Sequence, residues 1–503
     1  MAPNILLVVT DQERQRSWLP EGVDLPWRQK LIDEGLEFTR YYTHSSPCSP
    51  SRASLFTGRY LPGHRVVDNV IQPEHTELDP EIPTIGSVLR DGGYRSSYIG
   101  KWHLSQSAHP DMTAYGFCDW GGNDRHFMGW AGTGVQFDPI IAENAAHWIR
   151  THAGPGRSTE PWFLTVALVN PHDVMWFPID QPGYEQAHPA EVSQARSLLE
   201  QAAWKEGDPI PVYSEDYEEI FSELPANFDD DLHSKPEAHR QWRYDQQHGI
   251  WGMIDPADKG AWLRHLDYYV ELHRLADRSL GTVLQALSDA GAWDDTVVIF
   301  TSDHGDMCGS HGLRSKGPFV YEEIMRVPLY VRVPGVTKPG SVTDALATHV
   351  DLARTICSLA GADAGASQGA SGLNGVDLCP VINGTARSIR DHVLFAQDSA
   401  HTEHLNSVRY ALRGFFDGET KYARYYGVGG GKPATGLWGR SPGHKLFDVD
   451  SDFDDLDHEW YDHRSDPLEL VNLANDRGRR RELRGHFERM LTYEREELDV
   501  LAR

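Results

Sequence analysis

Cys48 stands at what we expect to be the start of a helix, with neighbours suited to chemistry on an anion. Pro50 and Ser51 are typical of a helix start, and residues 52–60 read as the helix that follows. Residue 48 would then lie at the positive end of this helix, where unpaired backbone N–H groups favour an anion. Arg52 can offer planar paired donors to a tetrahedral oxyanion. The alternative is an ordinary buried cysteine.

Oxygen ligands and one imidazole follow two predicted strands. Asp11 and Gln12 end the first apolar run of the chain, and Asp303 and His304 follow the run at residues 296–301. Together these side chains can hold one divalent cation in a mostly oxygen shell. Taken singly, Asp11 is explained equally well as a strand-end cap, and His304 as a turn histidine bonded to backbone.

The segment around Cys48, continued to Thr57-Gly58-Arg59, resembles a known signature. It is similar to that of the formylglycine-dependent (type I) sulfatases of the alkaline phosphatase superfamily, C-x-P-S-R followed by a helix ending in T-G-R. In that family a formylglycine-generating enzyme oxidises the cysteine to an aldehyde, so the resemblance implies formylglycine at Cys48. A thiol has no easy route for releasing a transferred sulfuryl group. An aldehyde hydrate does, because one hydroxyl attacks and the other expels the group.

Further segments resemble the same family, namely Gly100-Lys101-Trp102-His103, Asn170-Pro171-His172 and the run 311–317, which supplies Lys316. Alternation along an extended chain would put Lys101 and His103 on one face. The resemblance implies that Lys101 and Lys316 bind the peripheral sulfuryl oxygens and that His172, with Lys316, protonates the leaving alcohol. It implies that His103 takes a proton from the second hydroxyl. A lone lysine or histidine, by contrast, is more often a solvated or core residue.

The resemblance also implies a metal and its ligands. The metal, with Arg52, would orient the aldehyde hydrate and polarise the sulfuryl group. We expect Ca²⁺, with Mn²⁺ or Mg²⁺ as competitors, and an imidazole ligand favours Mn²⁺ more than an asparagine would. Where the family usually has Asp-Asp and Asp-Asn pairs, this chain has Asp-Gln and Asp-His, as in the branch of phosphonate monoester hydrolases and choline sulfatases. The expected ligands are Asp11, Gln12, Cys48, Asp303 and His304.

Composition and charge narrow the classes of partner. The chain has 503 residues, of which 40% are hydrophobic and 10% aromatic, as in a folded globular protein. Asp and Glu number 74 against 47 Lys and Arg, giving a formal net charge of −27. This charge argues against sequence-independent binding to nucleic acid or to an anionic membrane. An anionic substrate must therefore be bound by local cations.

The N-terminus and the cysteines indicate the compartment. Met1 to Asn4 lead directly into the first apolar run, without the basic leader and apolar segment of a signal peptide. No later stretch approaches the ~18 uninterrupted apolar residues of a membrane span. We therefore expect a cytoplasmic protein. Besides Cys48, four cysteines fit no zinc spacing and are predicted to be free thiols: Cys118, Cys308, Cys357 and Cys379.

Helical and strand patterns alternate along most of the chain. The predicted helix–strand pairs are 83–90 with 94–99, 140–151 with 162–168, and 262–290 with 296–301. This alternation predicts an α/β fold, with a large, mixed, mainly parallel sheet sandwiched by helices. The family resemblance implies the alkaline-phosphatase-like form. Active sites in such sheets lie at the carboxyl ends of the strands, where Asp11, Asn170 and Ser302 fall.

The domain organisation follows from changes in pattern. Residues 173–260 are rich in Pro, acidic and aromatic residues without a clear period, which predicts an insertion or lid over the site. We expect this segment to belong to a catalytic domain of residues 1–390. A smaller α+β domain would span 391–503.

Within this second domain, residues 408–416 and 420–426 are predicted to pair as antiparallel strands around Asp417-Gly418. Residues 479–501 form a final amphipathic pattern typical of a helix. The C-terminal segment also resembles the corresponding unit of the sulfatases.

These observations favour arylsulfatase-like hydrolysis of an organic sulfate monoester, R–O–SO₃⁻, to alcohol and sulfate. The nearest alternative uses the same site on a phosphonate monoester or phosphodiester, which the Asp-Gln and Asp-His pairs favour. A third hypothesis is a binding protein with a silent site, for example because Cys48 is never oxidised. Neither the alcohol part of the substrate nor the oligomeric state is predicted.

Overall fold

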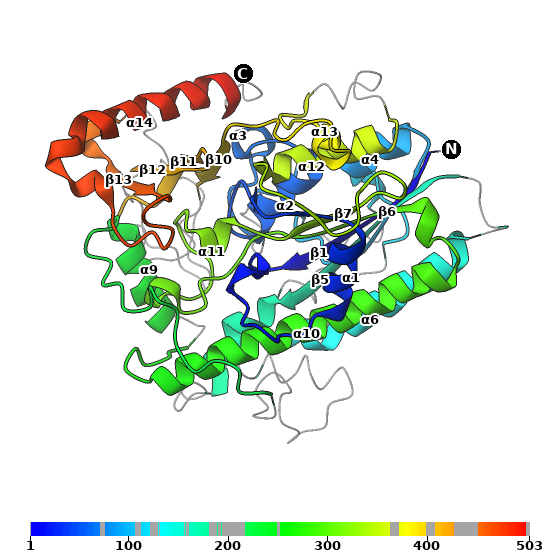
Figure 1. Cartoon of the computed structure of the whole chain (residues 1–503), viewed down its shortest axis with the longest axis horizontal. Coiled ribbons are helices and arrows are strands. Elements are labelled where there is room, and N and C mark those ends of the chain that lie inside the picture. The colour runs from blue at the N-terminus through cyan, green and yellow to red at the C-terminus, as the bar shows by residue number, and fades with distance from the viewer. Residues whose placement is uncertain are drawn as a thin grey trace.

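A mixed seven-stranded sheet forms the centre of the molecule, with strand order β4-β5-β1-β6-β7-β2-β8 (Figure 1). The computed structural model describes residues 2–70, 76–105, 112–120, 129, 131–154, 156, 160–180, 189, 193, 217–248, 252–362, 372–398, 408–426 and 451–498. The strands of this sheet are β1 (Asn4–Asp11), β2 (Leu36–Phe38), β4 (Arg95–Gly100), β5 (Trp162–Pro171), β6 (Thr296–Ser302), β7 (Leu329–Arg332) and β8 (Ser341–Thr343). β4, β5, β1 and β6 are parallel, whereas β7 is antiparallel to both β6 and β2. The predicted fold class is confirmed.

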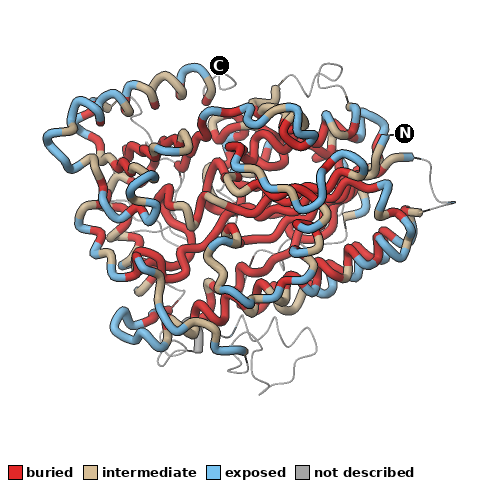
Figure 2. Tube along the Cα trace, viewed as in Figure 1, coloured by how far each residue is buried: buried red, intermediate tan, exposed pale blue. Residues whose placement is uncertain are grey.

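The sheet is buried on both faces because its strands are almost continuously apolar. In β1, Ile5, Leu7 and Val9 belong to one hydrophobic core and Leu6 and Val8 to another. Successive side chains of a strand point to opposite faces, so an unbroken apolar run serves two cores at once. Figure 2 shows the strands as a buried layer in the middle of the molecule.

Helices cover both faces of this sheet. In the view of Figure 1, α6 and α10 lie below the sheet, and α2, α4 and α12 lie above it. The helices are α1 (Pro26–Glu34), α2 (Cys48–Thr57), α3 (Leu61–His64), α4 (Ile85–Asp91), α6 (Thr133–His152), α9 (Glu237–His248), α10 (Lys259–Asp289), α11 (Glu322–Met325), α12 (His349–Leu359), α13 (Cys379–Ile382) and α14 (Arg480–Tyr493). α6 starts before the predicted residue 140 and carries Pro139 inside it, although proline normally disfavours a helix interior.

A second, antiparallel sheet with order β10-β11-β12-β13 is built from the C-terminal part of the chain. Its strands are β10 (Val393–Gln397), β11 (Ala411–Phe416), β12 (Thr420–Tyr426) and β13 (Asp457–Asp462). The predicted pairing of β11 with β12 is confirmed, and Gly418 in their turn has a φ of +93°. Two short strands, β3 (Tyr41–Tyr42) and β9 (Ala347–Thr348), pair separately. The boundary expected at 390/391 falls just before β10.

Some predictions concern segments that the structure describes only in part. Much of the expected insertion at 173–260 lies outside the described residues, as do residues 499–501 of the expected final helix. In the described ranges no helix is long and apolar enough to cross a membrane. The thiols of Cys118, Cys308, Cys357 and Cys379 are free, as predicted.

Candidate functional site

The carboxyl ends of β1 and β6 bring four of the five predicted metal ligands into one buried group. β1 ends at Asp11 and pairs with β6, which Asp303 and His304 follow directly. The Sγ atom of Cys48 lies 3.6 Å from Asp11 Oδ1 and 3.3 Å from His304 Nε2. His304 Nε2 is in turn 3.8 Å from Asp303 Oδ1. All four side chains are fully buried.

Helix α2 begins at Cys48 itself, one turn earlier than the sequence indicated. Pro47 precedes the helix, so Pro50 lies in its first turn and Ser51 does not cap it. The Ser51 hydroxyl instead donates to the backbone oxygen of Asp303 at 2.5 Å. The expected position of residue 48 near the positive helix end is retained, because Cys48 is the first helical residue.

Arg52 clamps two carboxylates. Its Nε donates to Asp303 Oδ2 at 2.9 Å, one terminal nitrogen to Asp11 Oδ2 at 3.1 Å, and the other to the backbone oxygen of Lys101 at 2.9 Å. Its side chain is completely buried. The guanidinium therefore holds β1, β6 and the end of β4 together.

Lys101 lies directly beyond β4 and reaches the same carboxylate. Its Nζ is 2.7 Å from Asp11 Oδ2, and both side chains are fully buried. Burial alone would lower the pKa of Lys101, but Asp11 and the Cys48 sulfur raise it above its usual value. The ammonium is therefore charged at neutral pH.

His103 arrives near this group by a turn and not by strand alternation. Its φ is +60°, so the chain is not extended there, contrary to the geometry we expected. Its backbone oxygen accepts from the Ser49 hydroxyl at 2.5 Å, which ties the turn to α2. Burial, with the charges of Lys101 and Arg52, holds the pKa of His103 well below its usual value, so its imidazole is neutral.

His172 and Lys316 complete the predicted set. Burial, followed by the charges of Lys316 and Lys101, keeps the pKa of His172 well below its usual value. The Nδ1 atom of His172 is buried and has no hydrogen-bond partner among the described residues. Lys316 donates to the side-chain oxygen of Gln12 at 2.5 Å. All the residues predicted from the sequence are thus buried around the ends of β1, β4, β5 and β6.

The donor set fits a divalent cation. One ligand atom each from Asp11, Cys48, Asp303 and His304 lie within 4.8 Å of one another. Lys101, His172 and Arg52 hold the pKa of Asp11 well below its usual range despite burial. Burial and the Asp11 charge raise the pKa of Asp303 to about 7. A cation would stabilise the ionised form of Asp303, which burial and the neighbouring Asp11 disfavour.

A second acidic group is already neutralised. Glu322, His463 and Glu469 also lie close enough together to bind a metal. Lys421 stands between them, with its Nζ 2.7 Å from an oxygen of each glutamate. The group at the ends of β1 and β6 is therefore the better candidate for a metal site.

Sequence reasoning missed several residues that hold the site. Asn69 Oδ1 accepts the backbone N–H of Ser49 at 3.0 Å, and no pattern in the sequence marked it. Asp306 accepts a hydrogen bond from the Gln12 amide at 2.5 Å. The sequence Ser302-Asp303-His304-Gly305-Asp306 could have indicated Asp306, because this residue lies only two positions after the predicted ligand His304.

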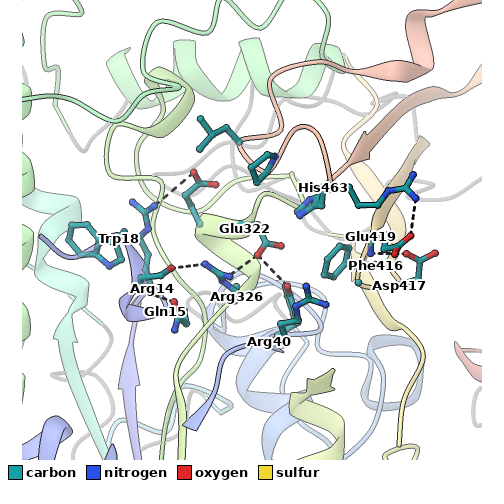
Figure 3. Close-up of a pocket in the computed structure, with 17 residues that line it drawn as sticks. Arg14, Gln15, Trp18, Arg40, Glu322, Arg326, Phe416, Asp417, Glu419 and His463 are labelled. Carbon is teal, nitrogen blue, oxygen red and sulfur yellow. Dashed lines mark hydrogen bonds and ion pairs between the residues drawn. The ribbon is translucent and has the colours of Figure 1, made fainter. Parts of the chain in front are cut away.

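A polar cavity of about 720 Å³ lies beside the loop that follows β1. It is lined by Arg14, Gln15 and Trp18, by residues of α11, and by the β11–β12 turn, and none of the predicted site residues lines it (Figure 3). The Glu322 and Glu323 carboxylates in its wall form ion pairs with arginines. The cavity is thus distinct from the group around Cys48.

The chain is similar to known proteins over most of its length. Residues 3–362 match the family described as "Sulfatase", and residues 309–429 match "N-sulphoglucosamine sulphohydrolase, C-terminal". An uncharacterised sulfatase of Escherichia coli K12 is 29% identical over 386 residues, covering 71% of this chain and 68% of that protein. A choline-sulfatase of Rhizobium meliloti is 26% identical over 510 residues, covering 95% and 83%. The phosphonate monoester hydrolase of Silicibacter pomeroyi has a similar fold, with a TM-score of 0.70, 20% identity and coverage of 99% and 96%.

Proposed function

Because this chain belongs to the sulfatase family, we propose that it hydrolyses organic sulfate monoesters to alcohol and sulfate, using formylglycine derived from Cys48. The observation that carries this proposal is the position of the Cys48 sulfur. It lies in the first turn of α2, 3.6 Å from Asp11 Oδ1 and 3.3 Å from His304 Nε2. A nucleophile at this point would stand beside a cation site, with fixed positive charges behind it.

The groups that the protein acquires after synthesis supply two kinds of chemistry. A formylglycine-generating enzyme would oxidise Cys48, and the hydrated aldehyde would offer one hydroxyl for attack on sulfur and a second for expulsion of sulfate. A divalent cation, Ca²⁺ with Mn²⁺ or Mg²⁺ as competitors, would supply Lewis-acid polarisation of the sulfuryl group. Asp11, Asp303, His304 and residue 48 would hold it. The Gln12 side-chain oxygen, which also accepts a hydrogen bond from Lys316 at 2.5 Å, would be a further donor through its second lone pair.

The protein's own side chains would then divide the remaining tasks. Lys101 and Lys316 would bind the peripheral sulfuryl oxygens and stabilise charge as the S–O bond breaks. His103, which is neutral, would take the proton from the second hydroxyl of residue 48. His172 would carry the proton to the leaving alcohol. Arg52 would hold the carboxylates of Asp11 and Asp303 in a fixed position relative to each other.

A phosphonate monoester or phosphodiester is the second candidate substrate. Its support is the presence of Gln12 and His304 at the metal site and the fold shared with phosphonate monoester hydrolases. The sulfate monoester remains favoured because it presents three unsubstituted peripheral oxygens, for which Lys101 and Lys316 are suitable partners. A diester carries a bulky group on one of these oxygens.

A parallel kinetic assay decides between these substrates. The purified protein is given an aryl sulfate, an alkyl sulfate, a phosphonate monoester and a phosphodiester, and kcat/KM is measured for each. The names of relatives suggest choline sulfate and N-acetylglucosamine 6-sulfate as further compounds. We expect the highest kcat/KM on a sulfate ester. A preference for the phosphodiester or phosphonate over every sulfate would overturn the proposal. Absence of turnover in protein whose Cys48 is fully oxidised would favour a silent binding protein.

A further inference from the structure

We propose that Asp306 is a positioning residue that fixes the orientation of the Gln12 side-chain amide and, through it, the place of the Lys316 ammonium. This inference rests on the proposed function for its catalytic consequence. The chain of contacts runs from Asp306 Oδ2 to Gln12 Nε2 at 2.5 Å and from Gln12 Oε1 to Lys316 Nζ at 2.5 Å. We call these three residues the amide relay.

Every polar group of Gln12 is used. Its backbone N–H donates to Asp303 Oδ1 at 3.0 Å, and its backbone oxygen accepts from the Tyr269 hydroxyl at 2.5 Å. Its φ is +70°, a left-handed conformation that a residue other than glycine rarely adopts. The surrounding contacts therefore hold Gln12 in a backbone conformation that would otherwise be unfavourable.

The polarity of the relay permits only one orientation of the amide. A carboxylate only accepts hydrogen bonds and an ammonium only donates them, so the amide must turn its nitrogen to Asp306 and its oxygen to Lys316. The reversed amide would place two acceptors together at one end and two donors at the other. Asp306 is itself held by the backbone N–H of Cys308, which donates to Oδ1 at 2.6 Å.

The amide relay lies in the interior, where loss of a hydrogen-bond partner costs the most free energy. Gln12, Asp306 and Lys316 are 0%, 1% and 2% exposed, so water cannot easily replace a lost partner. Lysine has a long flexible stem, and the Gln12 oxygen is the acceptor that fixes its end here. Because Lys316 lies within electrostatic range of Asp11 and His172, displacing it would disturb both the sulfuryl site and the proposed proton donor.

A polarity-swap experiment tests the relay. In Asp306→Asn the amide group at 306 can donate where an acceptor stood, and in Gln12→Glu a second carboxylate faces Asp306. We expect each single variant to lose about 10- to 100-fold in kcat/KM, mostly in kcat, as removal of a partner behind a catalytic group typically does. The double variant D306N/Q12E should recover most of the loss. In it the carboxylate introduced at position 12 accepts hydrogen bonds both from the amide introduced at position 306 and from Lys316.

A matched control uses the next glutamine of the same loop. Gln15 accepts from the backbone N–H of Ser17 and lies outside the relay. The combination D306N/Q15E should show no recovery. Recovery in D306N/Q15E equal to that in D306N/Q12E, or additive losses in D306N/Q12E, would overturn the relay.

The free energy of unfolding gives a second readout that does not depend on catalysis. The same double-mutant cycle, followed by urea denaturation, should show D306N/Q12E closer to the wild type than the sum of the single variants predicts. If the wild type hydrolyses no sulfate ester, the proposed function fails, and this unfolding cycle alone decides the relay. If the changes in the free energy of unfolding of the two single variants simply add in the double variant, the relay is refuted.

Discussion

The Sγ atom of Cys48 and the Nε2 atom of His304 lie 3.3 Å apart, although the residues are separated by 256 positions in the sequence. The contact exists because α2 begins at Cys48 and because His304 follows β6, the strand beside β1. It places the proposed nucleophile at the edge of the cation site. The proposed mechanism therefore depends on oxidation of residue 48.

Replacing Cys48 tests this dependence. Cys48→Ala should abolish sulfatase turnover, because no aldehyde can form. It should fold normally, since its contacts with Asp11 and His304 belong to the site and only a small side chain is removed. Steady-state kinetics and circular dichroism measure the two outcomes. More than a trace of activity in this variant would refute the aldehyde mechanism. Cys48→Ser should also be nearly inactive in a host whose maturation enzyme requires cysteine.

Removing the Lys101 ammonium tests the choice of substrate. Lys101→Ala should lower sulfatase kcat/KM by ~10² or more, because a charge that stabilises the transition state is lost. Any phosphodiesterase side activity should fall less. Lys338→Ala is the control, since this exposed lysine lies away from the site. Equal losses on both substrates would contradict the assignment of sulfate esters.

The metal can be identified and altered through His304. Anomalous scattering from crystals of protein purified without chelator should reveal one cation beside Asp11, Asp303 and residue 48. His304→Asn should raise the preference for Ca²⁺ over Mn²⁺, because an amide oxygen is a harder ligand than imidazole. Competition between the two ions, measured by elemental analysis, reports this preference. No anomalous peak among these side chains would exclude the site.

Acid should destabilise the fold through buried neutral histidines such as His44. Its Nδ1 lies 2.7 Å from the oxygen of Leu394 and its Nε2 accepts the N–H of Leu61, so both ring nitrogens are committed. Burial lowers the pKa of His44 to about 3, from about 6.5 in the unfolded chain. As the pH falls, the unfolded chain binds this proton first. The contribution of His44 to the free energy of unfolding is therefore complete above pH ~6.5. It declines as the pH falls toward ~3, by up to about 1.4 kcal/mol per pH unit.

Urea unfolding at pH values between 7 and 4 measures this effect. The free energy of unfolding should depend less on pH in His44→Gln than in the wild type. The difference in slope should correspond to about one proton fewer taken up on unfolding. His233→Asn, which changes an exposed histidine, is the control for the substitution itself. Equal slopes in the wild type and His44→Gln would show that His44 does not resist protonation.

Much of the fold could be predicted because its signals are local. The apolar run of β1 ending in Asp11, and the repeated alternation of helix and strand, indicate a buried parallel sheet with polar residues at one edge. The meeting of Asp11 with Asp303 then follows from the topology. The start of α6 was harder to predict, because tertiary packing overrides the local effect of Pro139.

The fine geometry of the site could not be predicted in the same way. Gln12 and His103 have positive φ values of +70° and +60°, which no propensity of these residue types indicates. The side-chain partners of Arg52 are carboxylates more than 40 positions away in sequence. Such hydrogen bonds join residues that only the tertiary fold brings together, so no local sequence pattern indicates them.

The most direct test of the central claim is the mass of the tryptic peptide from Tyr41 to Arg52, measured together with sulfatase activity across preparations. Oxidation of the Cys48 thiol to an aldehyde lowers the mass of this peptide. We predict that the rate per molecule of protein rises in proportion to the fraction of peptide carrying the aldehyde, and that fully unmodified protein is inactive. Full sulfatase activity in protein whose Cys48 remains entirely a thiol would contradict the account.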